Sequence, residues 1–437
     1  MKLRFLIILL LVTATSFAQT APSLTLRDAV RLALDKNPAH KVAQADVAAS
    51  SAGVEMARTS FLPRVDFSES LTRGNDPVYA FGTRLRQGRF TQADFALSSL
   101  NYPSPISDFA SRVGGQWNVF DSFQNRFQFR RAKSLQQSAQ RQLTRADQEV
   151  IYRVVDSYYG LLLAQRQLDV SEQTLKTAQA IVDSTTARVE AGTTVDADAL
   201  SARVMFATRQ QEVIRARGAV EVARTQLETA LGAHLPPGQQ PADALAERGF
   251  RAAELEQAEA LALKQRPDLQ ALALQIAAQH DSVRSAKAAF GPRLDVFGSW
   301  EADNPSFASG GNSNWMTGAT LRIDLFARDK NAKLALEKAT LSRAEAAQQG
   351  AQDSIRLEAR RAWVEYDSAR QMLDVARSAT RQADESLRIV RDRYESGLTP
   401  VTELLRAEDA ARSSQTNYWQ AVYRQAVSYA ALELATG

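Results

Sequence analysis

Residues 112–135, RVGGQWNVFDSFQNRFQFRRAKSL, change from one periodicity to another at Asp121. Before this residue, the apolar residues Val113, Trp117 and Val119 alternate with polar ones, which predicts a strand with one apolar face. After it, strong helix formers follow one another without a proline. A short strand that leads directly into a helix is therefore the unit from which we interpret the rest of the chain.

Two segments favour very long helices. Ser122 to Glu190 contains one glycine and no proline, and so does Ala327 to Glu395. At 1.5 Å per residue, each would be about 100 Å long, which exceeds the size of a compact domain. Shorter helices are expected at Thr25 to Ser60, Thr194 to Leu231, Ala253 to Phe290 and Pro400 to Ala435. Two short helices beside one long helix predict an elongated bundle, although the helices alone also fit a coiled-coil rod.

The same landmarks occur twice along the chain. Asn37-Pro38 corresponds to Arg266-Pro267, and Ala191-Gly192 corresponds to Ser396-Gly397, in the same order and at similar offsets. The first copy is longer, and its extra residues lie between Pro63 and Phe120. We expect a signal peptide at residues 1–18 and two repeats, at residues 19–232 and 253–437. Each repeat is expected to contain a helix, two strands, a long helix and a helix, and a proline-containing linker at residues 233–252 joins the two repeats.

The N-terminus has the features of a secretory signal. Lys2 and Arg4 precede an apolar run from Phe5 to Val12, and small residues lead to an expected cleavage before Gln19. A membrane anchor is the alternative, but the run is shorter than the roughly 20 residues that span a bilayer. We therefore expect the mature chain to be exported.

Four runs of alternating residues predict strands with one apolar and one polar face. Their apolar residues are Val65, Phe67 and Leu71; Val113, Gly115, Trp117 and Val119; Leu294, Val296 and Trp300; and Ala319, Leu321, Ile323 and Leu325. The pattern fits transmembrane strands, with a soluble half-buried sheet as the alternative. Four strands in lipid leave two open edges, so a barrel has to be shared between chains. Two chains give a filled interior, whereas three give room for water.

Composition argues against several other classes of protein. The chain has no cysteine, which excludes a disulfide framework, and its formal charge of +4 comes from interleaved acids and bases, so nucleic acid is not an expected partner. His40, His234 and His280 are isolated from one another. Because no metal-ligand spacing, phosphate loop or nucleophile elbow occurs, we predict no enzyme, no metal and no cofactor.

The sequence resembles the TolC-like outer-membrane efflux proteins, also called outer membrane factors. The resemblance covers nearly all of the mature chain and is strongest in Leu24-Thr25-Leu26 with Asn37-Pro38, in Trp117-Asn118-Val119-Phe120-Asp121, and in Arg393-Tyr394-Glu395-Ser396-Gly397-Leu398-Thr399 with Glu403-Leu404-Leu405 and Ala407. It implies an α+β membrane protein: a homotrimer with a shared 12-stranded transmembrane β-barrel in the outer membrane and a 12-helix periplasmic α-helical tunnel.

The implied function is that of a conduit from periplasm to exterior in a tripartite efflux or secretion system. Its implied partners are a periplasmic membrane-fusion adaptor and an inner-membrane pump of the RND or ABC type, which would supply the small molecules to be exported. A periplasmic coiled-coil scaffold or adaptor without a pore is the alternative, because it would share the signal peptide and the long helices.

The resemblance also implies site residues. The adaptor-docking helix tips of the family match Ala191, Gly192, Thr193 and Thr194, and Ser396, Gly397, Leu398 and Thr399. Its tunnel constriction matches Glu403 and Arg406, and a tip contact that breaks on opening matches Asp198 and Tyr394. Three copies of Glu403 would form a carboxylate ring that favours cations, but Arg406 lies one helical turn away and can pair with Glu403, so the ion selectivity stays open. A solvated helix face is the alternative for these two residues. Capping chemistry alone also accounts for Gly192 and Gly397.

The extra residues of the first copy lie in a polar stretch, Arg73 to Ser111, that contains glycine and proline. We interpret it as a surface loop between strands, and as a lid over the outer mouth in a second interpretation.

Overall fold

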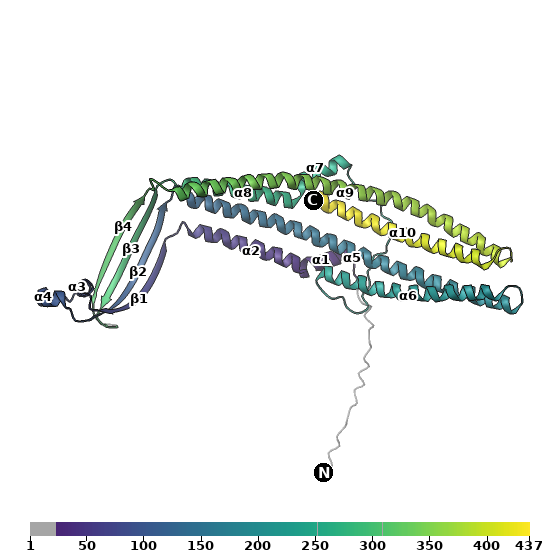
Figure 1. Ribbon diagram of the computed structural model, residues 1–437, viewed down its shortest axis with the longest axis horizontal. Coiled ribbons are helices and arrows are strands. Elements are labelled where there is room, and N and C mark those ends of the chain that lie inside the picture. Colours follow the sequence, from purple (N-terminus) through teal and green to yellow (C-terminus); the bar gives the residue numbers. More distant parts are fainter. Residues whose placement is uncertain (1–22, 251, 308) are drawn as a thin grey trace, which may run out of the picture. The chain divides into compact units, whose positions relative to one another are not determined.

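The computed structural model describes residues 23–250, 252–307 and 309–437. The predicted signal peptide, residues 1–18, lies outside them. The elements follow in this order (Figure 1): α1 (Leu26–Lys36), α2 (Pro38–Thr59), β1 (Arg64–Gly74), α3 (Pro77–Arg86), the 3-10 helix η1 (Gln92–Phe95), α4 (Leu97–Asn101), β2 (Ile106–Phe120), α5 (Gln124–Glu190), α6 (Asp196–Leu231), α7 (Leu255–Gln265), α8 (Pro267–Ala288), β3 (Arg293–Asn304), β4 (Asn312–Arg322), α9 (Arg328–Glu395) and α10 (Val401–Thr436).

The chain forms two compact units. The first, unit 1, takes its residues from the N-terminal segment that ends at Lys41, from Ala146–Lys264 and from Leu357–Gly437. The second, unit 2, holds Val42–Arg145 and Gln265–Arg356. Helices α5 and α9 each contribute residues to both units.

The two long helices begin and end within two residues of their predicted bounds, at 67 and 68 residues. Before α5, Ser122 and Phe123 have φ of 56° and 70°, a left-handed conformation that is rare outside glycine. The Ser122 hydroxyl donates to the Pro292 carbonyl oxygen at 2.8 Å. A Cβ on Gly291 would lie 2.1 Å from the Ser122 Oγ, so this close approach requires glycine.

Each predicted repeat begins with two helices where we expected one. Asn37 and Arg266 have extended backbones, with ψ of 130° and 123°. Pro38 and Pro267 cause this, because a proline lacks the N–H that continues a helix and disfavours helical geometry in the residue before it. The expectation of one continuous helix in each place was wrong, although the landmarks that break the helices were visible in the sequence.

The four strands form one antiparallel sheet in the order β1-β2-β3-β4, and they lie side by side in Figure 1. Phe67 is opposite Val113, Val113 is opposite Trp300, and Trp300 is opposite Trp315. These residues form a row across one face. Phe67 is 68% exposed and Trp315 is 76% exposed, so the apolar face of the sheet is uncovered in the single chain.

The opposite face is polar. Arg112 is opposite Glu301, and Asp303 lies two residues further along the same face of β3. Two apolar side chains, Phe297 and Met316, also lie on this face, and the ring of Phe297 occupies the space where a Cβ on Gly318 would lie. The predicted division of the sheet into an apolar and a polar face is confirmed.

The fourth strand departs from its predicted bounds. It starts at Asn312 and ends at Arg322, so Ile323 and Leu325 lie outside it. The alternation of residue types continues past the point where pairing with β3 ends at Arg293. Alternation alone does not locate the end of a strand, because the partner strand decides where the ladder stops.

The stretch between β1 and β2 is more ordered than a loop. It contains α3, η1 and α4, and β2 begins as early as Ile106. Pro77 opens α3, and the Asp76 carboxylate caps it by accepting the Tyr79 N–H at 2.9 Å. This Asp-Pro start was a helix signal in the sequence, and the expectation of a plain loop was wrong.

In unit 1, the predicted linker at residues 233–252 packs against the helices. Leu245 is buried. The Asp243 carboxylate accepts the Leu26 N–H at 3.0 Å and lies 2.8 Å from the Tyr158 hydroxyl. The Leu26 N–H lowers the pKa of Asp243, and burial raises the pKa of Tyr158. The linker thus fastens the start of α1 to the middle of α5.

In unit 2, α8 is the most buried helix among the described residues. The Ser138 hydroxyl of α5 donates to the Ala271 carbonyl oxygen at 3.0 Å. The Gln128 side chain, two to three turns earlier on α5, donates to the Ser285 hydroxyl at 2.9 Å. Side-chain hydrogen bonds therefore join α5 to α8 at both ends of α8.

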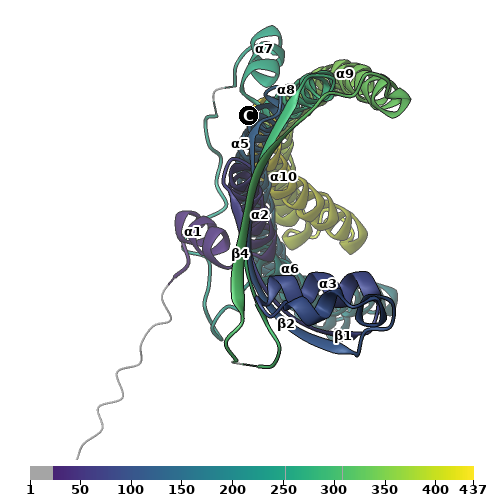
Figure 2. The same cartoon turned by 90° about the vertical axis from the view of Figure 1, so that its left-hand side faces the viewer.

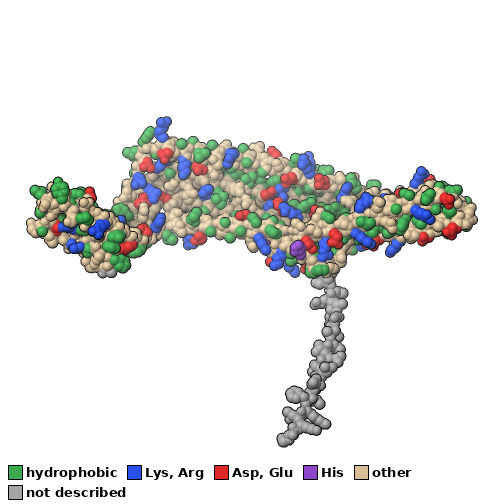
Figure 3. Space-filling view, turned by 60° about the horizontal axis from the view of Figure 1, so that its bottom comes forward, with side chains coloured by type: hydrophobic (Ala, Val, Ile, Leu, Met, Phe, Trp, Pro, Cys, Tyr) green, Lys and Arg blue, Asp and Glu red, His purple; other side chains and the backbone are tan. Residues whose placement is uncertain are grey.

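Acidic and basic side chains alternate over the face that Figure 3 presents. Within the described residues, none of the helices combines the length and the hydropathy needed to cross a membrane.

Candidate functional site at the helix turns

Two helix turns in unit 1 have the same backbone geometry. Gly192 follows α5 with φ of 71°, and Gly397 follows α9 with φ of 75°. In both turns the next N–H bonds back to a carbonyl five residues earlier, at 2.9 Å from Thr193 and 2.8 Å from Leu398. This pattern closes a helix with a left-handed residue and satisfies its last carbonyl groups. The predicted left-handed caps are confirmed.

The residues predicted to dock an adaptor form these two turns. Most of them are exposed, and Thr194 and Thr399 are half-buried; the full set is Ala191, Gly192, Thr193, Thr194, Ser396, Gly397, Leu398 and Thr399. Pro400 caps α10 with an extended backbone, and its carbonyl oxygen accepts the Glu403 N–H at 3.1 Å. The turns therefore present short polar side chains and two apolar side chains, Ala191 and Leu398, at the helix ends.

Helices α5 and α6 form one helical hairpin and α9 and α10 form the other, and Tyr394 lies inside the contact between these two hairpins. Its hydroxyl is 3.2 Å from the Thr185 hydroxyl, and the Arg188 guanidinium lies 4.5 Å from the centre of its ring. Arg188 also donates to the carbonyl oxygens of Tyr394 and Glu395, both at 3.1 Å. Arg188 thus holds the last turn of α9 against α5 by a cation–π contact and two hydrogen bonds.

Asp198 has a different local partner. Its carboxylate accepts a short hydrogen bond from the Thr194 hydroxyl, and its N–H donates to the Val195 carbonyl oxygen at 3.0 Å. In the single chain, the tyrosine of the predicted tip pair bonds Thr185 and its aspartate bonds Thr194. The structure therefore does not bring Tyr394 and Asp198 together as hydrogen-bond partners within one chain.

Glu403 and Arg406 form the ion pair that their spacing predicts. The Arg406 guanidinium donates to the Glu403 carboxylate at 2.8 Å. The side chains are 77% exposed for Arg406 and 48% exposed for Glu403. Solvent screens such a pair, so it contributes little to stability and its charges stay available to an ion in solution.

A second set of charges joins α6 to α10. The buried Arg209 guanidinium donates to Glu212 at 2.9 Å and makes a short contact with Asp409. Nearby, Arg391 of α9 donates to the buried Glu408 carboxylate at 2.7 Å. The sequence carried no signal for the contact of Arg209 with Asp409, because two hundred positions separate the two residues.

The sequence analysis also did not identify Arg188 and Thr185 as site residues. One signal was present: Arg188 lies in the last turn of α5, where a basic residue is favoured by the helix dipole. That signal does not name Tyr394 as its partner.

The sequence matches the profile of the outer membrane efflux protein family over residues 29–233 and 260–437. These two ranges contain both hairpins, both helix turns and all four strands. The chain belongs to the outer membrane efflux protein family. The resemblance stated from its motifs is thereby confirmed.

Individual relatives agree with the family. The chain is 24% identical over 432 residues to the alkaline protease secretion protein AprF of Pseudomonas aeruginosa, which covers 96% of this chain and 85% of AprF. It is 31% identical over 159 residues to the outer membrane protein OprJ of the same organism, covering 36% of this chain and 33% of OprJ. The solved structure of the Campylobacter jejuni CmeC outer membrane channel aligns with a TM-score of 0.79 at 19% identity, covering 94% of this chain and 85% of CmeC.

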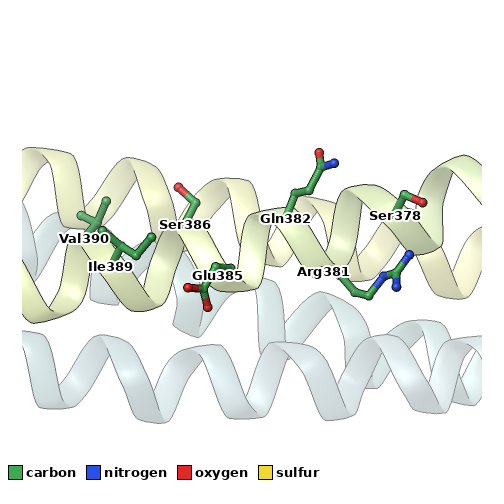
Figure 4. Close-up of a pocket in the computed structure, with 7 residues that line it drawn as sticks. All are labelled: Ser378, Arg381, Gln382, Glu385, Ser386, Ile389 and Val390. Atoms are coloured by element: carbon green, nitrogen blue, oxygen red, sulfur yellow. The ribbon is translucent and has the colours of Figure 1, made fainter.

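In this member of the outer membrane efflux protein family, α9 also carries an open groove of about 590 Å³ (Figure 4). All of its lining residues come from α9: Ser378, Arg381, Gln382, Glu385, Ser386, Ile389 and Val390. The groove is distinct from the predicted docking residues at the turns. Its lining residues are exposed or half-buried, and Val390 also packs against the apolar cluster that contains Ile181, Val401 and Leu404.

The turns expose polar and charged side chains. Among the described residues, no group of three or more His, Asp or Glu side chains is placed to hold a metal ion. The site consists of an exposed ion pair, a cation–π contact and two capped turns.

Proposed function

We propose that the chain is the outer-membrane channel component of a tripartite efflux or secretion system. Three copies would share one barrel in the outer membrane and one helical tunnel in the periplasm, forming a conduit and not a catalyst. The names of AprF, OprJ and CmeC, which describe secretion or an outer membrane location, agree with this proposal.

The four-stranded sheet carries the proposal. It has an exposed apolar face, a polar face, and edges at β1 and β4 that have no partner strand among the described residues. An open edge in lipid leaves unpaired N–H and C=O groups, so β1 would have to pair with β4 of another copy. Three copies close twelve strands with room for water.

The partners we propose are a periplasmic adaptor and an inner-membrane pump. The two turns offer the adaptor a repeated surface, since Thr193 and Leu398 occupy equivalent places in capped turns of the same geometry. In the trimer, Glu403 and Arg406 would form rings of alternating charge at the periplasmic end. We also propose that residues 1–18 are removed on export and that two repeats arose by duplication, with the boundary at 233–252.

The first test separates inner and outer membranes, extracts the protein in detergent and measures the protein mass of the particle by light scattering. We expect an outer-membrane trimer that conducts ions in a planar bilayer. A soluble monomer or dimer would contradict the channel and favour the periplasmic scaffold. A periplasmic scaffold would not need an exposed apolar sheet face, and Phe67 and Trp315 lie on such a face. Their exposure favours the channel.

A further inference from the structure

Helix α3, in the segment between β1 and β2, packs against the sheet within unit 2. Ala80, Thr83 and Gln87 are buried. Their spacing of three and four residues places them on one side of the helix. The Tyr79 hydroxyl donates to the Thr72 carbonyl oxygen at 2.9 Å, which ties the start of α3 to β1. Figure 2 shows α3 beside β1 and β2.

The C-terminal turn of α3 contacts the sheet. The sheet side chains in this contact all lie on the polar face. The Gln87 amide donates to Asp108 at 2.9 Å, and the Arg86 guanidinium lies 3.5 Å from Glu301 and 3.6 Å from Asp303. The register puts these three carboxylates on the face of Arg112 and away from the row of Phe67, Val113, Trp300 and Trp315. Helix α3 therefore covers the polar face.

Arg86 is the charged centre of this contact. It reaches three carboxylates, since Asp108 also lies 3.8 Å from it. Asp303 is 0% exposed, and its Oδ1 lies 3.6 Å from the Arg86 Nε and has no hydrogen bond. Its other oxygen accepts from Asn314 at 3.1 Å, and the Asn314 amide also donates to the Arg86 carbonyl oxygen at 3.2 Å. Without Arg86, buried like charges would face one another at this place.

Side-chain contacts join the rest of the segment to α3. The rings of Phe81 and Phe90 are 4.7 Å apart, and those of Phe90 and Phe95 are 5.1 Å apart, both edge to face. Arg84 pairs with Asp94 in the same cluster. These contacts join α3 to η1.

We propose that residues 75–105 form a lid on the inside of the external mouth and that Arg86 is the residue that latches it. The inference rests on the proposed function, because the polar face lines a lumen only if the sheet is part of a channel wall. The segment joins the strand ends that lie away from α2 and α5, so it belongs to the external end of the strands. Breaking the three ion pairs of Arg86 would let the lid leave the polar face.

The test uses the absence of native cysteine. Ser68 lies on the polar face of β1, four residues from Thr72 on the side away from the lid. A Ser68→Cys variant in intact cells is treated with a membrane-impermeant maleimide. The labelling rate is compared between native Arg86, Arg86→Ala and Arg86→Lys, with Arg89→Ala as the matched control, because Arg89 forms none of the three ion pairs.

We expect Arg86→Ala to raise the labelling rate severalfold, and Arg89→Ala to leave it unchanged. Arg86→Lys keeps the charge and should label slowly, which separates a latch from a general loss of folding. Higher salt should speed labelling of the protein with native Arg86, because the ion pairs are screened. Equal rates in Arg86 and Arg86→Ala cells would overturn the lid.

A reference site separates failure of the lid from failure of the proposed function. Ser306 is exposed in the β3–β4 connection, so Ser306→Cys should be labelled from outside at the same rate in every variant. Labelling at Ser306→Cys with equal rates at Ser68→Cys would reject only the lid. No labelling of Ser306→Cys in intact cells, with labelling after lysis, would reject the channel.

Discussion

At the scale of single residues, Arg188 holds the two hairpins together at their turns. Removing its side chain deletes a cation–π contact to Tyr394 and two hydrogen bonds to backbone carbonyl oxygens. We expect Arg188→Ala to destabilise this contact by about 2 kcal/mol. Hydrogen exchange should become faster at residues 188–194 and 393–399.

Arg406→Ala is the control for this prediction. It removes an exposed ion pair, so the expected loss is only about 0.3 kcal/mol. If the two substitutions had equal effects on hydrogen exchange at the turns, this would show that Arg188 does not hold the two hairpins together.

The junction between β2 and α5 requires a residue without a side chain at Gly291. Gly291→Ala would place a Cβ 2.1 Å from the Ser122 Oγ, so we expect a destabilisation of about 1–3 kcal/mol. Ser122→Gly should rescue it, because it removes the clash and glycine prefers the observed φ of 56°. Denaturant unfolding of the detergent-solubilised protein measures both effects, and a double variant as unstable as Gly291→Ala would contradict this explanation.

Local spacing decided which site residues could be predicted. The Glu403 and Arg406 pair and the caps at Gly192 and Gly397 depend on neighbours within one or two turns, and the sequence displays these directly. The contact of Arg209 with Asp409 depends on how two distant helices pack, and single-sequence periodicity carries no such information. The pairing of Tyr394 with Asp198 came from the family resemblance and stays a prediction, and in the single chain the Tyr394 hydroxyl lies against Thr185.

At the scale of secondary-structure elements, the helix turns require glycine for conformation alone. No atom would contact a Cβ placed on Gly192 or Gly397, yet both have a left-handed backbone. We expect Gly192→Ala and Gly397→Ala each to cost about 1 kcal/mol.

Gly350 is the matched control, because it lies inside α9 with open space around it and no positive φ. Gly350→Ala should stabilise the helix by about 1 kcal/mol. Thermal unfolding measures the three variants, and the same sign of change at Gly192 and Gly350 would contradict the role of the turn conformation.

The linker provides a pH-dependent attachment. The folded pKa of Asp243 is lowered by the Leu26 N–H, so its stabilisation is present above the unfolded pKa of about 4 and is lost as the pH falls through the folded pKa. Asp243→Asn should cost about 1 kcal/mol at neutral pH, after allowance for partial exposure. The difference in stability between the two proteins should shrink below pH 4, and a constant difference would contradict this attachment.

The elements themselves were predicted well where one signal dominates. Helices α5 and α9 lack proline, and their ends carry glycine or a strand-to-helix change, so their bounds were found within two residues. Helix α3 was missed because ten residues give too few turns for a clear periodicity, although Asp76 and Pro77 marked its start. Strand β4 was misplaced because its end depends on β3.

At the scale of the whole molecule, charge at the proposed constriction sets ion selectivity. Glu403 and Arg406 occur once per chain and would be present in three copies around the axis. Glu403→Gln should shift selectivity towards anions, and Arg406→Ala towards cations, because each leaves a ring of one sign. The reversal potential of the channel in a salt gradient measures both, and shifts of equal sign would place these residues outside the conducting path.

The path of the chain through the two units sets the order in which they form during export. Leu24, Val154 and Val422 belong to one apolar cluster of unit 1, whereas unit 2 ends at Arg356. A polypeptide delivered from its N-terminus has all of unit 2 available while the last segment of unit 1 is still being translocated. The apolar stripe of α5 then stays exposed until α10 packs against it, and such exposed apolar surface is prone to aggregation. We therefore expect unit 1 to complete its apolar cluster only after the C-terminal segment has crossed.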